Sequence, residues 1–200
     1  MPKAVLWDIG NVIVRWDPRT LYSKIFPDPA ERDRFLTEVC TMAWHEAHDR
    51  GVRFEDNRAE LIARYPEHEA AIRAWGDRWW EMFSGPIAET EAAIEALYAR
   101  GVPMYGLSNI SQHTIEGTFA LSPAFRRLKG VLVSGAEGLT KPDPAIFRLA
   151  CERFGLAPAE VLFVDDGARN VEAARALGFD VHLFDDPRAL HPALAARGLL

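Results

Sequence analysis

The stretch Ala4-Val-Leu-Trp-Asp8-Ile-Gly10-Asn11 decides the fold, because it is a short apolar run that ends in a carboxylate and a turn. A continuous apolar run of this length predicts a strand buried on both faces, with Asp8 at its carboxyl end. Four later apolar runs have the same shape and also end in polar residues. They cover residues 102–107, 130–133, 161–164 and 179–184.

Helical patterns lie between these runs. Residues 88–100, 144–154 and 168–177 carry apolar side chains at helical spacing, and a glycine ends each pattern. Strand and helix therefore alternate along the chain. This alternation predicts an α/β fold with a doubly wound, Rossmann-like parallel sheet that helices cover on both faces.

Residues 18–84 break the alternation, since they are rich in charged and aromatic residues and helical in pattern, without a strand-like run. We expect them to form a small α-helical cap inserted after the first strand. The α/β core then comprises residues 1–17 and 85–200. A chain of 200 residues suits a core domain with a smaller inserted one.

Charge and composition exclude several classes of partner. The net charge of −6 argues against nonspecific binding to nucleic acid or anionic membrane, since both require a basic surface. No apolar stretch approaches the roughly 20 residues of a membrane helix. The first residues lack the pattern of a signal peptide, and Cys40 and Cys151 have no metal-type spacing. We expect a cytoplasmic protein with reduced thiols; nothing in the sequence indicates an oligomeric state.

Polar side chains at the ends of the predicted strands suggest chemistry, because ligands of open parallel sheets bind beyond the carboxyl ends. Each of these side chains alone has an ordinary explanation as a turn, a helix cap or a surface charge. Together they supply a carboxylate, a hydroxyl, an ammonium and a pair of acids, which suits Mg²⁺-assisted phosphoryl transfer. The residues are Asp8, Ser108-Asn109, Lys141 and Asp165-Asp166.

Four segments in order, residues 6–12, 106–109, 141–143 and 164–170, resemble the motifs of the haloacid dehalogenase superfamily of hydrolases. The resemblance spans nearly the whole chain, and this family places a helical cap after the first strand. It implies that Asp8 is the nucleophile and a Mg²⁺ ligand, together with the Gly10 carbonyl and Asp166. It further implies that Ser108 and Asn109 bind the phosphoryl group, that Lys141 bridges phosphate and nucleophile, and that Asp165 and Asn170 support the metal site.

Gly10 is a departure, since most phosphatases of this family carry there a second aspartate that acts as general acid and base. Residues 8–12 and the cap segment 44–51 look like a branch that includes glucose-1-phosphate phosphatase. Without the second aspartate, another group must protonate the leaving oxygen, or the leaving group must need little help. His45 and His48 are candidates for this catalytic role or for substrate binding, and packing in the cap is the alternative.

The sequence thus predicts a Mg²⁺-dependent hydrolase of small phosphorylated metabolites, such as sugar phosphates. A haloacid dehalogenase is the first alternative. That branch also lacks the second aspartate and needs no metal, but it usually has an aromatic residue at the position of Gly10 and an arginine shortly after. Here Arg15 follows, and the metal ligand Asp166 is retained. A non-enzymatic ligand- or partner-binding relative is the second alternative, and it leaves the retained lysine and acids unexplained.

Overall fold

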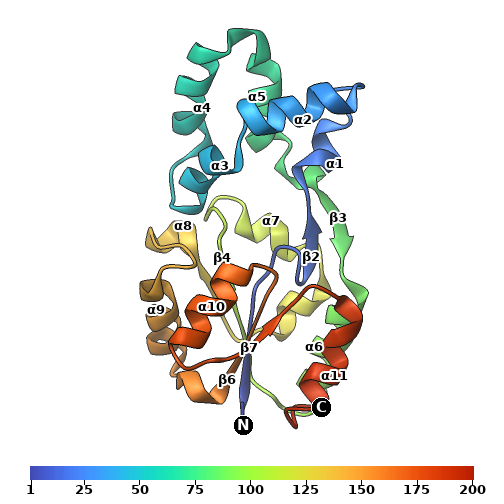
Figure 1. Cartoon of the computed structure of the whole chain (residues 1–200), viewed down its shortest axis with the longest axis vertical. Coiled ribbons are helices and arrows are strands. Elements are labelled where there is room, and N and C mark those ends of the chain that lie inside the picture. Colours follow the sequence, from blue (N-terminus) through green and yellow to red (C-terminus); the bar gives the residue numbers. More distant parts are fainter.

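A five-stranded parallel sheet forms the centre of the structure, a computed structural model that describes residues 1–200. The strand order β5-β4-β1-β6-β7 places the first strand in the middle (Figure 1). The five predicted strands and the Rossmann-like α/β fold are confirmed. The strands are β1 (Ala4–Trp7), β4 (Met104–Ser108), β5 (Val131–Val133), β6 (Val161–Asp165) and β7 (Asp180–Leu183).

Both faces of the sheet are buried, as the continuous apolar runs predicted. Val5 pairs with Leu162, and both belong to the core cluster that contains residues of α6 and α11. Leu6 pairs with Phe163, and both belong to a second cluster with α9 and α10. Successive side chains of β1 therefore anchor opposite layers. The helices are α6 (Ala88–Ala99), α9 (Pro144–Phe154), α10 (Ala168–Ala176) and α11 (Leu190–Ala195).

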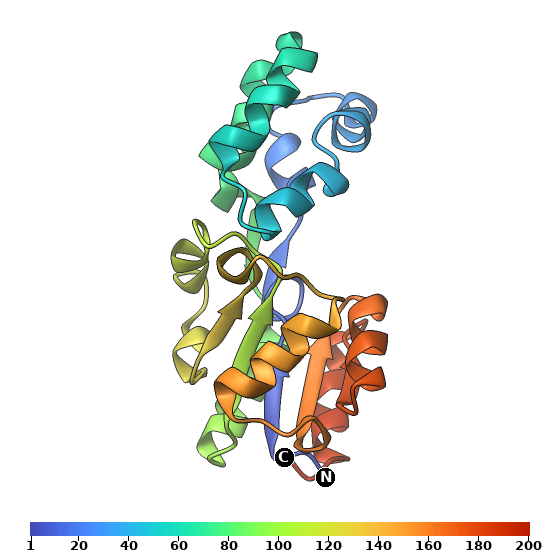
Figure 2. The same cartoon turned by 90° about the vertical axis from the view of Figure 1, so that its left-hand side faces the viewer.

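A helical cap stands over the carboxyl ends of the strands, while both chain ends lie at the opposite end of the molecule (Figures 1 and 2). The cap has its own packing, in which the Tyr22 hydroxyl donates to the Ala71 carbonyl over 3.0 Å. The predicted helical cap is thus present. No helix in the structure combines the length and apolar character required to cross a membrane. The cap helices are α1 (Pro18–Tyr22), α2 (Pro29–Glu38), α3 (Met42–Asp49), α4 (Phe54–Arg64) and α5 (Glu69–Asp77).

A two-stranded antiparallel ribbon connects core and cap, and the sequence pattern did not predict it. β2 (Val14–Trp16) pairs with β3 (Phe83–Pro86), so the outgoing and returning segments lie side by side. β3 begins inside the stretch expected to lack strands. These two strands are too short to show a period of two, which explains the omission. The remaining short segments are α7 (Ile115–Phe119), α8 (Ser134–Glu137), and 3₁₀ turns at Pro66–His68, Trp79–Met82, Pro123–Arg127, Pro158–Glu160 and Pro187–Ala189.

Candidate active site

A cavity of about 270 Å³ lies between the strand ends and the cap. It brings together most of the residues that the sequence singled out, although they come from separate loops and helices. Asp165 lies beneath the cavity and is fully buried, and His48 is fully buried within the cap. The predicted residues that line the cavity are Asp8, Gly10, His45, Ser108, Asn109, Lys141, Asp166 and Asn170.

Lys141 connects two carboxylates at the floor of this cavity. Its Nζ lies 2.8 Å from Asp8 Oδ1 and 2.6 Å from Asp165 Oδ2. Burial lowers the pKa of Lys141, but the charges of Asp165 and Asp8 outweigh burial and raise it above its usual range. Lys141 is therefore a fixed positive charge beside the carboxylate at the end of β1.

Asp165 accepts hydrogen bonds from three donors, and each of its oxygens takes part. Besides accepting from Lys141, it accepts from the Gly167 N–H over 2.7 Å and from Asn170 Nδ2 over 2.9 Å, both at Oδ1. Because both oxygens are engaged, Asp165 orients its neighbours. This arrangement suits the supporting role that the sequence predicted for Asp165 and Asn170.

The two polar residues at the end of β4 contribute in different ways. Ser108 is buried and lines the cavity. The side-chain amide of Asn109 bonds to the backbone of Lys141, because its Nδ2 donates to the Lys141 carbonyl and its Oδ1 accepts from the Lys141 N–H. Asn109 thus positions the loop that carries the ammonium group, a function that its motif did not reveal.

Three carboxylates converge at one edge of the cavity. Asp8, Asp165 and Asp166 each offer an oxygen, and these oxygens lie within 4.8 Å of one another. Burial raises the pKa of Asp8 to about 7; the Lys141 ammonium opposes this rise, and the charges of Asp165 and Asp166 add to it. Burial and the charge of Asp165 also raise the pKa of Asp166. A hard cation with oxygen ligands would relieve this repulsion, so the residues fit Mg²⁺.

Asn11 controls the turn that follows β1, and sequence reasoning gave it no role. It adopts a left-handed conformation with φ of 57°, which asparagine tolerates better than most residues. Its Oδ1 accepts from the Trp16 N–H over 2.9 Å. The turn leads the chain from β1 into β2 and places Trp16 on the wall of the cavity. The Gly-Asn sequence was the available signal.

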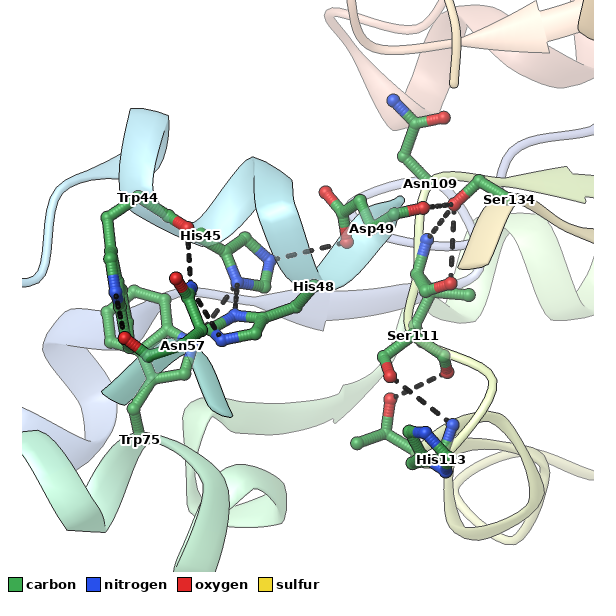
Figure 3. A network of polar contacts seen from close by, with 12 residues as sticks. Trp44, His45, His48, Asp49, Asn57, Trp75, Asn109, Ser111, His113 and Ser134 are labelled. Atoms are coloured by element: carbon green, nitrogen blue, oxygen red, sulfur yellow. Dashed lines mark hydrogen bonds and ion pairs between the residues drawn. The ribbon is translucent and has the colours of Figure 1, made fainter. Parts of the chain in front are cut away.

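The two candidate histidines form a buried network in the cap (Figure 3). His45 packs against the rings of Trp16 and Trp79, at centroid distances of 5.4 and 5.5 Å, and these two rings also contact each other. Its Nδ1 accepts from Trp75 Nε1 over 3.2 Å, which places its proton on Nε2. Asn57 Nδ2 lies 3.0 Å from His48 Nε2, which favours a proton on His48 Nδ1.

Burial in the cap keeps both imidazoles neutral. Burial, together with the charge of His48, lowers the pKa of His45 to about 3. Burial lowers the pKa of His48 to about 4. The acid role considered for these residues depends on a midpoint near neutral pH, and the lowered pKa values argue against it. His45 retains a neutral N–H at the cavity, and His48 Nδ1 lies 3.3 Å from His45 Nδ1.

A family model described as haloacid dehalogenase-like hydrolase matches residues 2–178. The chain belongs to this family. Among relatives of this haloacid dehalogenase-like hydrolase, the sesquiterpene phosphatase astK of Aspergillus oryzae is 24% identical over 92% of the chain and 90% of the relative. The drimenol cyclase drtB of Aspergillus calidoustus is 27% identical over 92% of the chain, which spans only 34% of that protein. (S)-2-haloacid dehalogenase 2 of Pseudomonas sp. is 30% identical over 48% of the chain and 42% of the relative.

Solved structures show the same fold. A HAD family enzyme from Bacteroides thetaiotaomicron, in complex with magnesium and inorganic phosphate, superposes with a TM-score of 0.68 at 20% identity, covering 95% of this chain and 99% of that one. A structure described as a dehalogenase superposes with a TM-score of 0.74 at 19% identity and covers 97% of both chains. Phosphatases and dehalogenases thus both occur among the relatives of this haloacid dehalogenase-like hydrolase.

Proposed function

We propose that this haloacid dehalogenase-like hydrolase is a Mg²⁺-dependent phosphatase of small phosphorylated metabolites that works through an aspartyl-phosphate on Asp8. The observation that carries the proposal is the group formed by Asp8, Lys141 and Asp166 at the floor of a capped cavity. It supplies a nucleophile, a charge that neutralises phosphate and a second metal ligand. A phosphatase is also among the relatives that the chain matches over most of their length.

Each of these residues has a definite task in the reaction. An oxygen of Asp8 attacks phosphorus, and the bond from phosphorus to the leaving oxygen breaks. Lys141 and Ser108 hold the phosphoryl oxygens and stabilise the charge that develops on them. Asp8, the Gly10 carbonyl and Asp166 would hold Mg²⁺, which would neutralise charge between phosphate and carboxylates. Water then releases phosphate and restores Asp8.

The walls of the cavity suit a small substrate with an apolar face. Trp16, Trp79 and Met42 line it beside the polar floor. Flat aromatic rings can pack against the apolar face of a sugar ring. This surface supports a sugar phosphate as substrate, in line with the branch suggested by Gly10. A panel of phosphorylated metabolites is the direct way to find the natural one.

One contact argues against dehalogenation. In the dehalogenase alternative, an arginine shortly after the nucleophile holds the substrate, and Arg15 is the candidate in this chain. The Arg15 guanidinium instead donates to the Pro86 carbonyl over 2.9 Å, and Arg15 does not line the cavity that contains Asp8. Asp166, which a metal-independent dehalogenase does not need, does line it.

Hydrolysis of 4-nitrophenyl phosphate tests the proposal, because this good leaving group needs little acid assistance. We expect activity with Mg²⁺, its loss with EDTA, and its loss in Asp8→Asn. A fluoroberyllate complex should place its beryllium beside Asp8. Chloride release from 2-chloropropionate without phosphatase activity would establish the dehalogenase instead. Inactivity towards both classes of substrate would favour a ligand-binding relative.

A further inference from the structure

Asp49, the last residue of α3, is a second carboxyl group facing the cavity, and it belongs to the cap. It lines the same cavity as Asp8, and only 8% of its surface is exposed. Its Oδ1 is buried without a hydrogen-bond partner. His45 Nε2 lies 3.5 Å from this oxygen, at the limit of a polar contact. A buried carboxyl oxygen with no hydrogen bond shorter than this contact is costly, so its place at a cavity wall points to a ligand.

The main chain around Asp49 is fixed to the core (Figure 3). The Asp49 carbonyl accepts from Ser134 Oγ over 2.6 Å. Two residues later, Gly51 approaches the backbone of Gly135 so closely that a Cβ on Gly51 would lie 2.5 Å from the Gly135 oxygen. These contacts join the end of α3 to the start of α8, directly after β5. Docking of the cap therefore sets the position of the Asp49 side chain over the cavity.

The surroundings of Asp49 favour a protonated carboxyl. Burial raises its pKa to about 7; the charge of Glu46 adds to the rise, and the charges of Lys141 and Arg50 oppose it. His45, whose Nε2 lies 3.5 Å from Asp49 Oδ1, is neutral and supplies no positive charge. At neutral pH, a substantial fraction of Asp49 therefore carries a proton, which is the condition for an effective general acid.

We propose that Asp49 is the general acid and base that takes the place of the aspartate missing at Gly10. This assignment rests on the proposed phosphatase function. As Asp8 attacks phosphorus, the electron pair of the breaking bond goes to the leaving oxygen, which takes the proton of Asp49. The products of this step are the free alcohol, the aspartyl-phosphate and the Asp49 carboxylate.

The second half of the reaction restores the proton. A water oxygen attacks the phosphorus of the aspartyl-phosphate, and one water proton returns to Asp49. The bond from phosphorus to Asp8 breaks, and its electron pair stays on the Asp8 carboxylate. Hydrogen phosphate leaves, so the sum is one ester and one water giving one alcohol and one phosphate. His45, held by the three tryptophans, is a positioning residue beside Asp49.

Leaving-group dependence tests this assignment. We would measure kcat/KM for wild type and Asp49→Asn across phosphate monoesters from 4-nitrophenyl to primary alkyl. The ratio of wild type to variant should stay below about 10 for the nitrophenyl ester and reach about 10²–10⁴ for alkyl esters, the range typical of a lost general acid. The Asp49→Asn variant keeps the hydrogen bond from Ser134, because that bond is made to the main-chain oxygen of residue 49. Thermal unfolding checks that the variant is folded.

A matched control is Glu60→Gln, which removes an exposed cap carboxylate that does not line the cavity and has no effect on the pKa of Asp49. Its leaving-group slope should equal that of wild type. A constant ratio across the series for Asp49→Asn, whether near one or large, would overturn the assignment, because an acid must matter more for poorer leaving groups. If wild type hydrolyses no phosphate with Mg²⁺, the proposed function fails, and this assignment fails with it. If wild type is active and the ratio is constant across the series, only the acid role of Asp49 is refuted, and the proposed function stands.

Discussion

Asn109 and Lys141 are joined by two hydrogen bonds, of 2.9 Å from Asn109 Nδ2 to the Lys141 carbonyl and 2.8 Å from the Lys141 N–H to Asn109 Oδ1. The pair links the end of β4 to the loop before α9. The position of the ammonium group at Asp8 therefore depends on a residue of another strand. The effect of Asn109 on Lys141 can therefore be tested separately from any contact between Asn109 and substrate.

Replacing Asn109 should weaken catalysis through Lys141. We expect Asn109→Ala to lower kcat/KM about 10- to 100-fold, as is typical when a group that orients a site residue is lost. The measurement is steady-state hydrolysis of an aryl phosphate. In a Lys141→Ala background, the same change should have a much smaller effect, because the residues act as a unit. Additive losses in the double variant would show that Asn109 acts independently of Lys141.

Removal of Asp166 should abolish the response to Mg²⁺. We expect Asp166→Ala to remain folded and to lose most Mg²⁺-dependent activity, because one of two carboxylate ligands is gone. Mg²⁺ should raise the melting temperature of wild type and not that of the variant, since only a bound ion stabilises the folded state. The control is Asp185→Asn, which removes an exposed acid after β7. Its activity and melting temperature should respond to Mg²⁺ as those of wild type do. A full Mg²⁺ response in Asp166→Ala would refute the assigned ligand.

The close approach of Gly51 and Gly135 predicts that Gly51→Ala undocks the end of α3. The added Cβ would clash with the Gly135 oxygen, and Gly51 has a φ of +96°. Activity should fall about 10- to 100-fold through misplacement of Asp49. Gly178→Ala is the control, since Gly178 has a φ of +90° with no atom near its Cβ position. That variant should lose about 1 kcal/mol of stability and keep its kinetics. Equal kinetics for both variants would contradict the docking role.

The free energy of unfolding should fall as pH rises, because Asp49 then ionises in a buried site. Its folded pKa is raised from 3.8 to about 7, so its contribution to stability is present below about pH 4 and lost as pH rises to about 7. The upper bound on this loss is about 4 kcal/mol. Asp49→Asn should therefore be more stable than wild type at pH 8, with the difference vanishing near pH 4. Chemical unfolding of wild type and Asp49→Asn between pH 4 and pH 8 measures this difference. A pH-independent difference for Asp49→Asn would mean that the carboxyl is not buried in solution.

The sequence predicted the sheet and the floor of the site well, for a physical reason. A strand covered on both faces must be a continuous apolar run, so residues 161–164 and the following acids are visible without a structure. Parallel strands then bring Asp8, Ser108 and Asp166 to one edge. The ribbon formed by β2 and β3 was not predictable, because Val-Arg-Trp and Phe-Ser-Gly-Pro show no period.

The cap side of the site was harder to predict, because its properties depend on packing between residues that are far apart in the sequence. His45 and His48 are three residues apart on a helix, which suggests an exposed pair. Their burial depends on Trp16, Trp75 and Trp79, which come from other segments. Likewise, Asp49 in the sequence His-Asp-Arg-Gly looks like a solvated helix end. Only contact with Ser134 of the core reveals it as a buried group.

The ribbon of β2 and β3 has a consequence for how such enzymes diversify. Val14 pairs with Pro86, so the chain leaves the core and returns to it at adjacent points. Whatever is folded between those points can be lengthened, shortened or exchanged as a cassette without altering the spacing of Asp8, Lys141 and Asp166. A chimaera joined at Val14 and Pro86 would thus keep the nucleophile and metal ligands of the core, and would take both its selectivity and the group at the position of Asp49 from the donor of the inserted part.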